Sequence, residues 1–401
     1  MQETTITAIK VTDQPTFLFF TTETAPTYAG DGLNALLLAQ TLAGKGYMAT
    51  IICLNPYRLL PDYEEYNAVS VLRVPYLFKT RFGRAMLRFR MVWKVFKIGR
   101  QYSTWMIYGA MPTHRLVILS GWLLGKKIVF RSTLYGFDNA SSLVNSGRGL
   151  QNRVKKWILG RVNGYYALNS KFANDWINLL RQSNNIFVSP QGVCCHKYNQ
   201  NNYSKAELRH ELNLPDNTVL LVMVGHLIQR KGFPQIFEWL SQIGGDFLLI
   251  QVGRNSAPEW DIMNRKNLEM SRIKELGKKM LGNRILFIGD TNRVNDYLTA
   301  SDIFLLNSQS EGFPPNSLNE AMAAGLPILS KNTYGYDDFL EDGINALIYS
   351  NVAEFTSKLK LLLSSAELRK QMGASAQMFT LGKNDIAVVA NNFLGFIGSI
   401  D

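Results

Sequence analysis

Short apolar runs alternate with amphipathic stretches along the first half of the chain. Residues 15–22 and 48–54 centre on unbroken apolar runs, which are typical of strands buried on both faces of a parallel sheet. Between these runs, Leu33, Leu36 and Leu37 recur at helical spacing. Further strands are expected in 103–110, 125–138 and 184–193, and 164–177 predicts a strand and then a helix capped by Ser170. This alternation predicts a doubly wound parallel sheet.

The second half repeats the alternation after a polar stretch. Residues 191–219 are polar with one short helical pattern, which is typical of a connection between domains. Residues 219–240 predict a strand, a loop and a helix, and further strands are expected in 246–253, 284–291, 301–310, 326–332 and 345–350. We therefore predict an α/β fold of two doubly wound parallel-sheet, Rossmann-like domains that face each other across a cleft. The active site is expected in that cleft.

The predicted domain bounds follow from these patterns. Residues 1–195 form an N-terminal domain, 196–218 a linker, and 219–380 a C-terminal domain. The apolar helix predicted in 381–401 is expected to pack back toward the N-terminal domain.

Composition agrees with a soluble globular protein, because 46% of the 401 residues are hydrophobic and 18% are charged. The cysteines Cys53, Cys194 and Cys195 are too few for a disulfide framework, and none has the Cys-x-x-Cys spacing of a metal site. The first residues lack the order of a signal peptide, and the apolar runs are too short to span a bilayer. A cytoplasmic location is therefore expected.

Positive charge is concentrated in the first half. The net charge is +12; residues 1–195 hold 23 Lys and Arg against 9 Asp and Glu, and the remainder holds 20 against 22. Such an excess predicts an anionic partner for the first domain, namely a membrane surface, a phosphorylated substrate or nucleic acid. No nucleic-acid-binding motif accompanies the charge, so nucleic acid is not expected.

Residues 79–100 contain eight basic residues and no acid, and they predict an amphipathic helix with two apolar stripes. The stripes are Phe82, Met86, Phe89, Trp93 and Phe96, and Leu87, Met91, Val95 and Ile98. One stripe can pack on the core while the other, flanked by cations, lies on anionic lipid headgroups. The residues expected at the membrane are Arg84, Arg88, Arg90, Trp93, Lys94 and Lys97. The alternative is a helix packed on both stripes with solvated charges. A second basic cluster in 148–161 favours membrane contact.

Glycines follow the first predicted strand at its carboxyl end, where parallel sheets bind ligands. Gly30 and Gly32 are expected in a tight loop before a helix. The third glycine of the dinucleotide fingerprint is missing, so a bound nicotinamide is not expected, and a plain turn is the alternative. His114 stands at a predicted helix start, where a histidine is more often structural than catalytic.

Cations stand beside glycines in a second loop, which follows the strand predicted near 219–224. The loop residues are Gly225, His226, Arg230, Lys231 and Gly232. Cations and glycines at the carboxyl end of a strand suit a phosphate. The alternative is a solvated basic turn.

Two glutamates, Glu311 and Glu320, bracket a proline turn in SEGFPPNSLNEAMAAG, residues 310–325. The longer stretch SQSEGFPPNSLNEAMAAGLPILS resembles the nucleotide-sugar site of GT-B fold glycosyltransferases, especially the retaining glycosyltransferase family 4. VGHLIQRKG, VSPQGV and GINALIY resemble other motifs of that family in order and spacing. The resemblance covers most of the chain; it is specific in the second half and mainly architectural in the first.

The resemblance implies a donor site for a nucleotide sugar. Carboxylates accept paired hydrogen bonds from diols, so Glu320, expected in the first helical turn, would bind the ribose. Glu311 would contact the donor sugar near its reacting carbon. Lys231 and Arg230 would neutralise the diphosphate as the glycosidic bond breaks. We therefore expect Glu311, Lys231 and Arg230 to be catalytic.

The other expected donor contacts include backbone amides at a helix N-terminus, which offers a positive dipole to a diphosphate. They are Gly225, His226, Gly253, Gly289, Gly312, Phe313, Pro314, Asn316, Ser317 and Leu318. No Asp-x-Asp metal site stands out in the sequence, and neither a metal nor a cofactor is expected.

The sequence departs from the family pattern at three places. Eight residues separate the two glutamates, one more than that family usually has, and Pro314–Pro315 is the predicted insertion. His226 stands in place of the family's loop arginine. A family histidine is absent where Thr133 and Tyr135 lie, and the nearby Asp138 is expected to serve the acceptor. The predicted acceptor contacts are Gly30, Asp31, Gly32, His114, Tyr135 and Asp138.

These features predict a metal-independent, retaining glycosyltransferase of the hexosyltransferase type. The expected acceptor is membrane-associated, a lipid-linked glycan in bacterial surface polysaccharide or lipopolysaccharide assembly, on the inner face of the cytoplasmic membrane. An epimerase or phosphorylase of the same fold is the alternative, but an epimerase needs more carboxylate and histidine groups than the first domain contains. A basic nucleic-acid-binding protein is the remote alternative.

Overall fold

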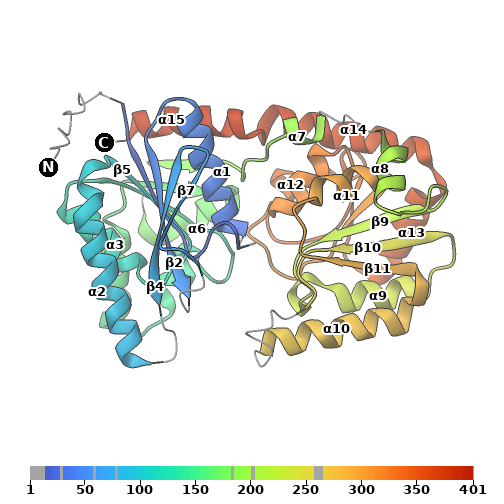
Figure 1. Cartoon of the computed structure of the whole chain (residues 1–401), viewed down its shortest axis with the longest axis horizontal. Helices are drawn as coiled ribbons and strands as arrows, with labels where there is room; N and C mark the ends of the chain where they lie inside the picture. Colours follow the sequence, from blue (N-terminus) through green and yellow to red (C-terminus); the bar gives the residue numbers. More distant parts are fainter. Residues whose placement is uncertain are drawn as a thin grey trace, which may run out of the picture. The chain divides into compact units, whose positions relative to one another are not determined.

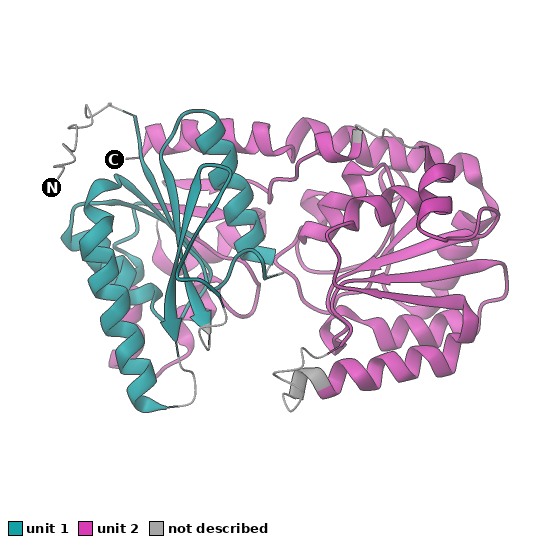
Figure 2. Cartoon of the chain, viewed as in Figure 1, with its two compact units in different colours: residues 1–130, 158–163 teal, residues 131–157, 164–401 magenta. Residues whose placement is uncertain are grey.

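A computed structural model describes residues 14–27, 30–56, 60–76, 80–181, 185–199, 204–256 and 265–400, without the side chains of 56, 199 and 265–267 (Figure 1). The chain forms two compact units (Figure 2). Unit 1 comprises residues 1–130 and 158–163, and unit 2 comprises 131–157 and 164–401. The domain bounds predicted from sequence are a separate partition of the chain, and they stay a prediction.

Unit 1 is built on a sheet whose strands follow the order β3-β4-β2-β1-β5-β6. The strands are β1 (Phe17–Phe20), β2 (Ala49–Pro56), β3 (Tyr63–Tyr66), β4 (Val69–Tyr76), β5 (Thr104–Tyr108) and β6 (Lys127–Arg131). The helices are α1 (Gly30–Gly44), α2 (Arg81–Ile98) and α3 (His114–Leu123). Strand β1 pairs in parallel with β2 and β5, as the apolar runs predict. Strand β2 also pairs in parallel with β4, a strand that was not predicted.

The β3–β4 hairpin at the edge of this sheet is antiparallel and was not predicted. Its turn residues Asn67 and Ala68 both have positive φ, 47° and 64°. Two positive φ angles in a two-residue turn suit the twist of a hairpin, but the usual sequence signal is Asn-Gly. Ala68 stands where that signal has glycine, so the sequence did not indicate a hairpin here.

Unit 2 holds the strand pair β7–β8 and a six-stranded sheet in the order β11-β10-β9-β12-β13-β14. The strands are β7 (Gly164–Ala167), β8 (Ile186–Val188), β9 (Val219–Val224), β10 (Phe247–Val252), β11 (Ile285–Gly289), β12 (Ile303–Leu306), β13 (Ile328–Lys331) and β14 (Ala346–Tyr349). The helices are α4 (Ala140–Asn145), α5 (Leu150–Leu159, ending in unit 1), α6 (Ser170–Leu180), α7 (His196–Asn199), α8 (Lys205–Glu211), α9 (Phe233–Ser241), α10 (Arg265–Leu281), α11 (Val294–Ala300), α12 (Asn316–Ala323), α13 (Val352–Ser364), α14 (Ala366–Lys383) and α15 (Ile386–Ser399).

Helices cover both faces of the six-stranded sheet. In β9, Leu220 and Val222 belong to a core cluster with α8, α11 and α12, whereas Leu221 and Met223 belong to a second cluster with α9, α10 and α13. Figure 1 shows these helices on the two faces. Covering both faces explains why the strand sequences are continuously apolar rather than alternating. All five pairs of neighbouring strands in this sheet are parallel. The predicted α/β fold of two parallel sheets is confirmed, while the predicted cleft stays a prediction.

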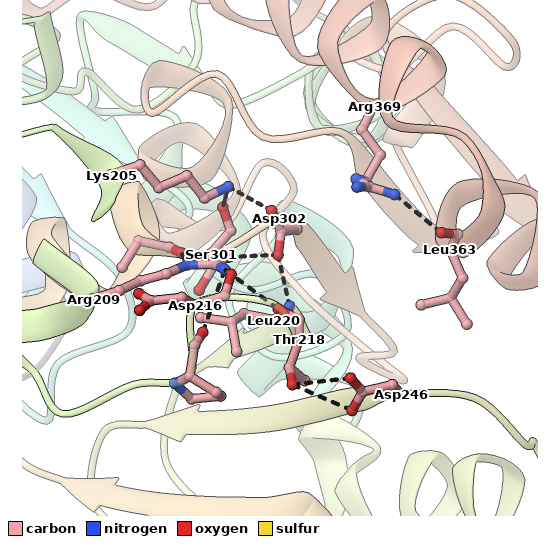
Figure 3. A network of polar contacts seen from close by, with 12 residues as sticks. Lys205, Arg209, Asp216, Thr218, Leu220, Asp246, Ser301, Asp302, Leu363 and Arg369 are labelled. Atoms are coloured by element: carbon pink, nitrogen blue, oxygen red, sulfur yellow. Dashed lines mark hydrogen bonds and ion pairs between the residues drawn. The ribbon is translucent and has the colours of Figure 1, made fainter. Parts of the chain in front are cut away.

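A buried arginine joins α8 to the six-stranded sheet (Figure 3). The Arg209 guanidinium pairs with Asp302 at 2.6 Å and donates to the carbonyl oxygen of Ala300 at 3.0 Å. Asp302 also accepts from the backbone N–H of Leu220 at 2.7 Å and pairs with Lys205 at 2.5 Å. The start of β9, the start of β12 and α8 are thereby held at one end of the sheet.

Three predicted boundaries were wrong. Gly30 and Gly32 lie in the first turn of α1 rather than in a loop before it. A Cβ on Gly32 would lie 1.6 Å from the carbonyl oxygen of Glu23, so the helix start packs too closely against the backbone for a side chain. Helix α6 is capped by Asn169 and not by Ser170. Helix α12 begins at Asn316, which makes Glu320 its fifth residue and places it beyond the first turn.

Among the described residues, no helix is both long enough and apolar enough to cross a membrane.

Candidate active site

Three glycines meet at the carboxyl ends of neighbouring strands β9, β10 and β11. Gly225 donates its N–H to the carbonyl oxygen of Val252 at 2.8 Å, and Gly253 donates to that of Gly289 at 2.8 Å. Their φ angles are 146°, 114° and 86° in chain order, a region that glycine adopts most readily. A Cβ on Gly253 would lie 2.8 Å from the carbonyl oxygen of Gly225. This end of the sheet is therefore bare backbone, as a bound phosphate would need.

The three predicted catalytic residues lie together. Lys231, the last residue of a short 3₁₀ turn (Gln229–Lys231), forms an ion pair with Glu311. Arg230 pairs with the other carboxylate oxygen of Glu311 at 3.2 Å. A Cβ on Gly225 would lie 3.2 Å from Cε of Lys231, so the lysine stem also borders the glycine end of the sheet. Two cations and one anion leave a net positive charge at this place.

The two cations keep Glu311 ionised. Burial alone would raise the pKa of this carboxyl, since only 7% of the residue is exposed. The charges of Lys231 and Arg230 outweigh burial and hold the pKa of Glu311 below its ordinary value. The side chain is thus a carboxylate at neutral pH that can accept hydrogen bonds but cannot donate them.

Backbone contacts fix the cationic loop to the end of β12. Gly232 has φ of 75°, and a Cβ there would lie 2.2 Å from the carbonyl oxygen of Asn307. Asn307 in turn donates its Nδ2 hydrogen to the carbonyl of Gly232 at 2.9 Å. The N–H of Gln309 donates to the carbonyl of Arg230 at 2.8 Å. The lysine and arginine are therefore presented from a rigid loop, and they reach a glutamate from a neighbouring one.

The segment after β6 lies against the turn that follows Glu311. A Cβ on Gly312 would lie 1.7 Å from the carbonyl oxygen of Thr133. The predicted acceptor residue Asp138 is buried and accepts from the N–H groups of Thr133 and Leu134 at 2.8 to 2.9 Å. Its carboxylate therefore closes the loop that approaches Gly312.

Tyr135 lies in the same loop and is tied to the site by backbone and ring contacts. Its carbonyl accepts from the Ser310 hydroxyl at 3.2 Å, one residue before Glu311. Its ring stacks on Tyr334 with centroids 3.9 Å apart. Lys171 lies over the Tyr334 ring at 4.8 Å. The predicted acceptor residues Tyr135 and Asp138 are thus brought next to the donor turn.

Glu320 has surroundings unlike those of Glu311. Burial raises its pKa to about 7, and the charge of Lys197 only partly opposes this effect. The side chain is partly exposed and lies on α12 after the turn. At the start of α12, two residues before Glu320, the N–H of Leu318 donates to the carbonyl oxygen of Pro315 at 3.0 Å. The two glutamates therefore differ in protonation near neutral pH.

The remaining predicted acceptor residues lie in unit 1. The Thr21 hydroxyl donates to Asp31 at 3.5 Å, and Gly30 and Gly32 belong to α1. Nδ1 of His114 lies 2.7 Å from the carbonyl oxygen of Met111, and burial lowers the pKa of this imidazole to about 4. These contacts are structural, and an acceptor role for these residues stays a prediction.

Helix α2 buries one of its two predicted apolar stripes. Leu87, Met91 and Val95 are buried, whereas Phe82 and Phe89 are 73% and 68% exposed. Trp93 is also exposed, and Lys97 lies 5.0 Å over its ring. Arg90 donates to the carbonyl of Pro75 at 3.3 Å and Lys94 to that of Arg73 at 3.2 Å. Of the predicted membrane cations, Arg84 and Arg88 are exposed, while Arg90 and Lys94 are half-buried.

Sequence reasoning missed three amide side chains that hold the proline turn. Asn169 donates to the carbonyl of Phe313 at 2.8 Å, and Gln191 donates to that of Pro314 at 3.0 Å. Asn319 donates to the carbonyl of Gln191 at 2.8 Å. The motif VSPQGV contains Gln191. Amide side chains are common on protein surfaces, however, and the sequence does not show which group such a side chain binds. Among the described residues, no three His, Cys, Asp or Glu side chains gather as metal ligands would.

Residues 204–379 match the protein family described as glycosyl transferases group 1. An uncharacterized glycosyltransferase of Haemophilus influenzae is 31% identical over 42% of this chain and 45% of its own length. The lipopolysaccharide core biosynthesis glycosyltransferase LpsE of Rhizobium meliloti is 23% identical over 48% of this chain and 53% of its own. The matches thus span about half the length of these relatives.

Solved structures show the same fold over nearly the whole chain. Sucrose-phosphate synthase from Thermosynechococcus elongatus has a TM-score of 0.78 at 17% identity, with 96% of this chain and 98% of that one covered. HepE from Anabaena in complex with UDP-glucose has a TM-score of 0.73 at 16% identity, with 96% and 100% covered. The fold is that of the GT-B glycosyltransferases, as the resemblance implied, while membership of the retaining family 4 stays a prediction.

Proposed function

We propose that this chain is a retaining, metal-independent glycosyltransferase that takes a sugar from a nucleotide-sugar donor. The main support is that Lys231 and Arg230 both form ion pairs with Glu311. This cluster lies beside Gly225, at the carboxyl end of the six-stranded sheet. It lies inside the stretch that matches the group 1 family, and the fold is shared with HepE, whose structure was solved with UDP-glucose. A cationic site that suits a diphosphate therefore lies within the residues that match a family of glycosyl transferases.

Lys231 and Arg230 are suited to the diphosphate of such a donor. In the transfer, the bond between the sugar carbon and the diphosphate oxygen breaks, and a bond to an acceptor hydroxyl oxygen forms. Negative charge grows on the leaving diphosphate, and the acceptor hydroxyl passes its proton to the departing diphosphate oxygen or to water. Cations fixed beside that diphosphate stabilise the transition state more than the ground state. Glu311, held ionised, would accept hydrogen bonds from sugar hydroxyls, and Glu320 would bind the ribose diol.

We propose a lipid-linked glycan at the inner face of the cytoplasmic membrane as the acceptor. Helix α2 supports this, because Phe82 and Phe89 are exposed beside Arg84 and Arg88 and the helix holds no acidic residue. Exposed aromatic groups flanked by cations bind the interface of anionic bilayers. LpsE, a relative over part of the chain, is named for lipopolysaccharide core biosynthesis. Retention of the anomeric configuration is supported by the family resemblance alone.

The test begins with donor binding. Thermal shifts are measured with UDP-glucose, UDP-N-acetylglucosamine, GDP-mannose and ADP-glucose, because a ligand that binds the folded state raises the melting temperature. Release of nucleoside diphosphate is then measured with and without a bacterial lipid extract, and the product's anomeric configuration is read by NMR. Diphosphate release that depends on the extract supports transfer. An epimerised donor, or phosphorolysis without an acceptor, would replace the proposal by the alternative chemistry of the same fold.

The matched pair of variants is Lys231→Ala and Lys278→Ala. Lys278 is an exposed lysine of α10 that pairs only with Glu275 on the same helix among the contacts described. Loss of donor turnover in the first variant and not in the second ties the activity to the site.

A further inference from the structure

The turn between the two glutamates cannot be held by an ordinary backbone ladder. Pro314 and Pro315 have no N–H, so this stretch offers carbonyl acceptors without matching donors. Each of its three carbonyls is nevertheless satisfied. Phe313 accepts from Asn169 Nδ2 at 2.8 Å, Pro314 from Gln191 Nε2 at 3.0 Å, and Pro315 from the N–H of Leu318 at 3.0 Å. Two of the three partners are side chains from distant segments.

Asn169 performs two tasks with its two polar atoms. Its Oδ1 accepts from the N–H groups of Lys171 and Phe172, both at 3.1 Å, and so caps α6. Its Nδ2 donates to Phe313, and the residue is fully buried. Capping α6 sets the orientation of the Asn169 side-chain amide. The oriented amide then holds the carbonyl group of Phe313 in place.

Gln191 connects both sides of the turn. Its side chain donates to Pro314, and its own carbonyl accepts from Asn319 Nδ2 at 2.8 Å. Asn319 precedes Glu320 on α12 and is fully buried; its Oδ1 accepts from Asn384 Nδ2 at 2.9 Å. One residue outside the turn therefore contacts the segment after Glu311 and the helix that carries Glu320.

We infer that Asn169, Gln191 and Asn319 are positioning residues that set the placement of Glu311 relative to Glu320 in the donor site. The inference rests on the proposed function, because those glutamates are its donor contacts. The side-chain amides of Asn169 and Gln191 are neutral, so they hold the turn carbonyls without adding a charge that would compete for Lys231 and Arg230. Both cations therefore stay available to a phosphate. Misplacing reacting groups by about 1 Å costs as much as 10²-fold in rate, which gives such a brace a kinetic consequence.

The test uses Asn169→Asp and Gln191→Met in the full chain. Aspartate is a good helix cap and keeps the acceptor for α6, but it has no donor for Phe313. Methionine keeps the approximate volume of glutamine without its donor. The control is Asn55→Ala, because Asn55 is also buried and also bonds two backbone groups, the carbonyl oxygen and the N–H of Leu60, and it belongs to unit 1 whereas the turn belongs to unit 2.

Two measurements are compared across the three variants. Amide hydrogen exchange by mass spectrometry is followed in residues 308–323, and melting temperatures report overall stability. Asn169→Asp and Gln191→Met are expected to speed exchange in 308–323 by about tenfold, the value of one lost hydrogen bond, whereas Asn55→Ala leaves that segment unchanged. Equal exchange in wild type and both turn variants would overturn the inference, whether or not a donor has been found.

Donor kinetics then separate positioning from mere stability. With the nucleotide sugar that gives the largest thermal shift, kcat/KM is expected to fall about tenfold in both turn variants and to stay near wild type in Asn55→Ala. Faster exchange with unchanged kinetics would show a structural brace without a positioning role and would overturn the inference. No turnover in wild type, with all four nucleotide sugars, contradicts the proposed function, and the exchange result still decides whether the brace exists.

Discussion

Lys231 and Glu311 form an ion pair across two neighbouring loops, with Arg230 on the second carboxylate oxygen at 3.2 Å. The pair holds the lysine beside Gly225, at the carboxyl end of the six-stranded sheet. A diphosphate that reached this place would meet two cations that are already oriented, so little reorganisation would accompany the growth of charge on the leaving group. The arrangement favours transfer chemistry over a purely structural salt bridge, because it leaves a net positive charge.

Replacing Lys231 by alanine is therefore expected to lower kcat by about 10²-fold or more, the usual cost of removing one group that stabilises transition-state charge. Lys231→Arg should recover part of the loss, since it keeps the charge but not the compact geometry of an ammonium. Steady-state release of nucleoside diphosphate measures both. A Lys231→Ala enzyme within twofold of wild type would remove the lysine from the reaction.

The buried pair of Arg209 and Asp302 predicts a loss of stability. Asp302→Asn leaves Arg209 buried without its counter-charge, which costs about 3 kcal/mol in comparable cases. Thermal unfolding measures this cost, with Asp216→Asn as the control, because Asp216 is exposed and contributes its backbone carbonyl to the network. A melting temperature of Asp302→Asn equal to that of the control would contradict the prediction.

The same variant carries a pH signature. Burial would raise the pKa of Asp302, but Lys205, the N–H of Leu220 and Arg209 outweigh it and hold the pKa below the ordinary 3.8. A carboxyl with a lowered folded pKa contributes stability above its ordinary pKa and loses that contribution as the pH falls through its folded pKa. The stability difference between wild type and Asp302→Asn should therefore shrink when melting is measured toward pH 3.

The periodicity of apolar residues predicted most strands and the main helices, because the sheets are covered on both faces and the strands are continuously apolar. The β3–β4 hairpin escaped prediction because Ala68 replaces the glycine expected in its turn. The contact between Lys231 and Glu311 could be expected from sequence, since both stand in motifs of fixed spacing, and their catalytic role stays a prediction. Asn169 and Gln191 could not, because their partners lie 144 and 123 residues away and backbone carbonyls leave no mark in the sequence.

Glu320 predicts a pH dependence of opposite sign to that of Asp302. Burial raises its pKa from an ordinary 4.5 to about 7, so the folded chain holds this proton over a range where the unfolded chain releases it. Stability from this group is present below about pH 4.5 and is lost as the pH rises toward 7. Because glutamine does not ionise, Glu320→Gln does not lose this stability as the pH rises. Its melting temperature should therefore increase relative to that of wild type between pH 5 and pH 8. Parallel curves, as expected for Glu238→Gln on the exposed face of α9, would contradict the assignment.

The exposed stripe of α2 predicts binding to anionic membranes. Arg84→Gln with Arg88→Gln removes two exposed cations, and Phe89→Ser removes an aromatic ring that is 68% exposed. Each change is expected to lower co-sedimentation with phosphatidylglycerol vesicles severalfold without altering the melting temperature, since each surface cation contributes about 1 kcal/mol near an anionic bilayer. Added salt should weaken the binding of wild type more than that of the double arginine variant.

The control for this prediction keeps the net charge equal. Lys278→Gln with Lys279→Gln removes two exposed cations from α10, outside the stripe. If both charge-matched variants lose binding equally, the attraction comes from net charge alone and α2 is not the docking element. If only the α2 variants lose binding, and Phe89→Ser loses it with no change of charge, then aromatic insertion and local cations act together, as an interfacial helix requires.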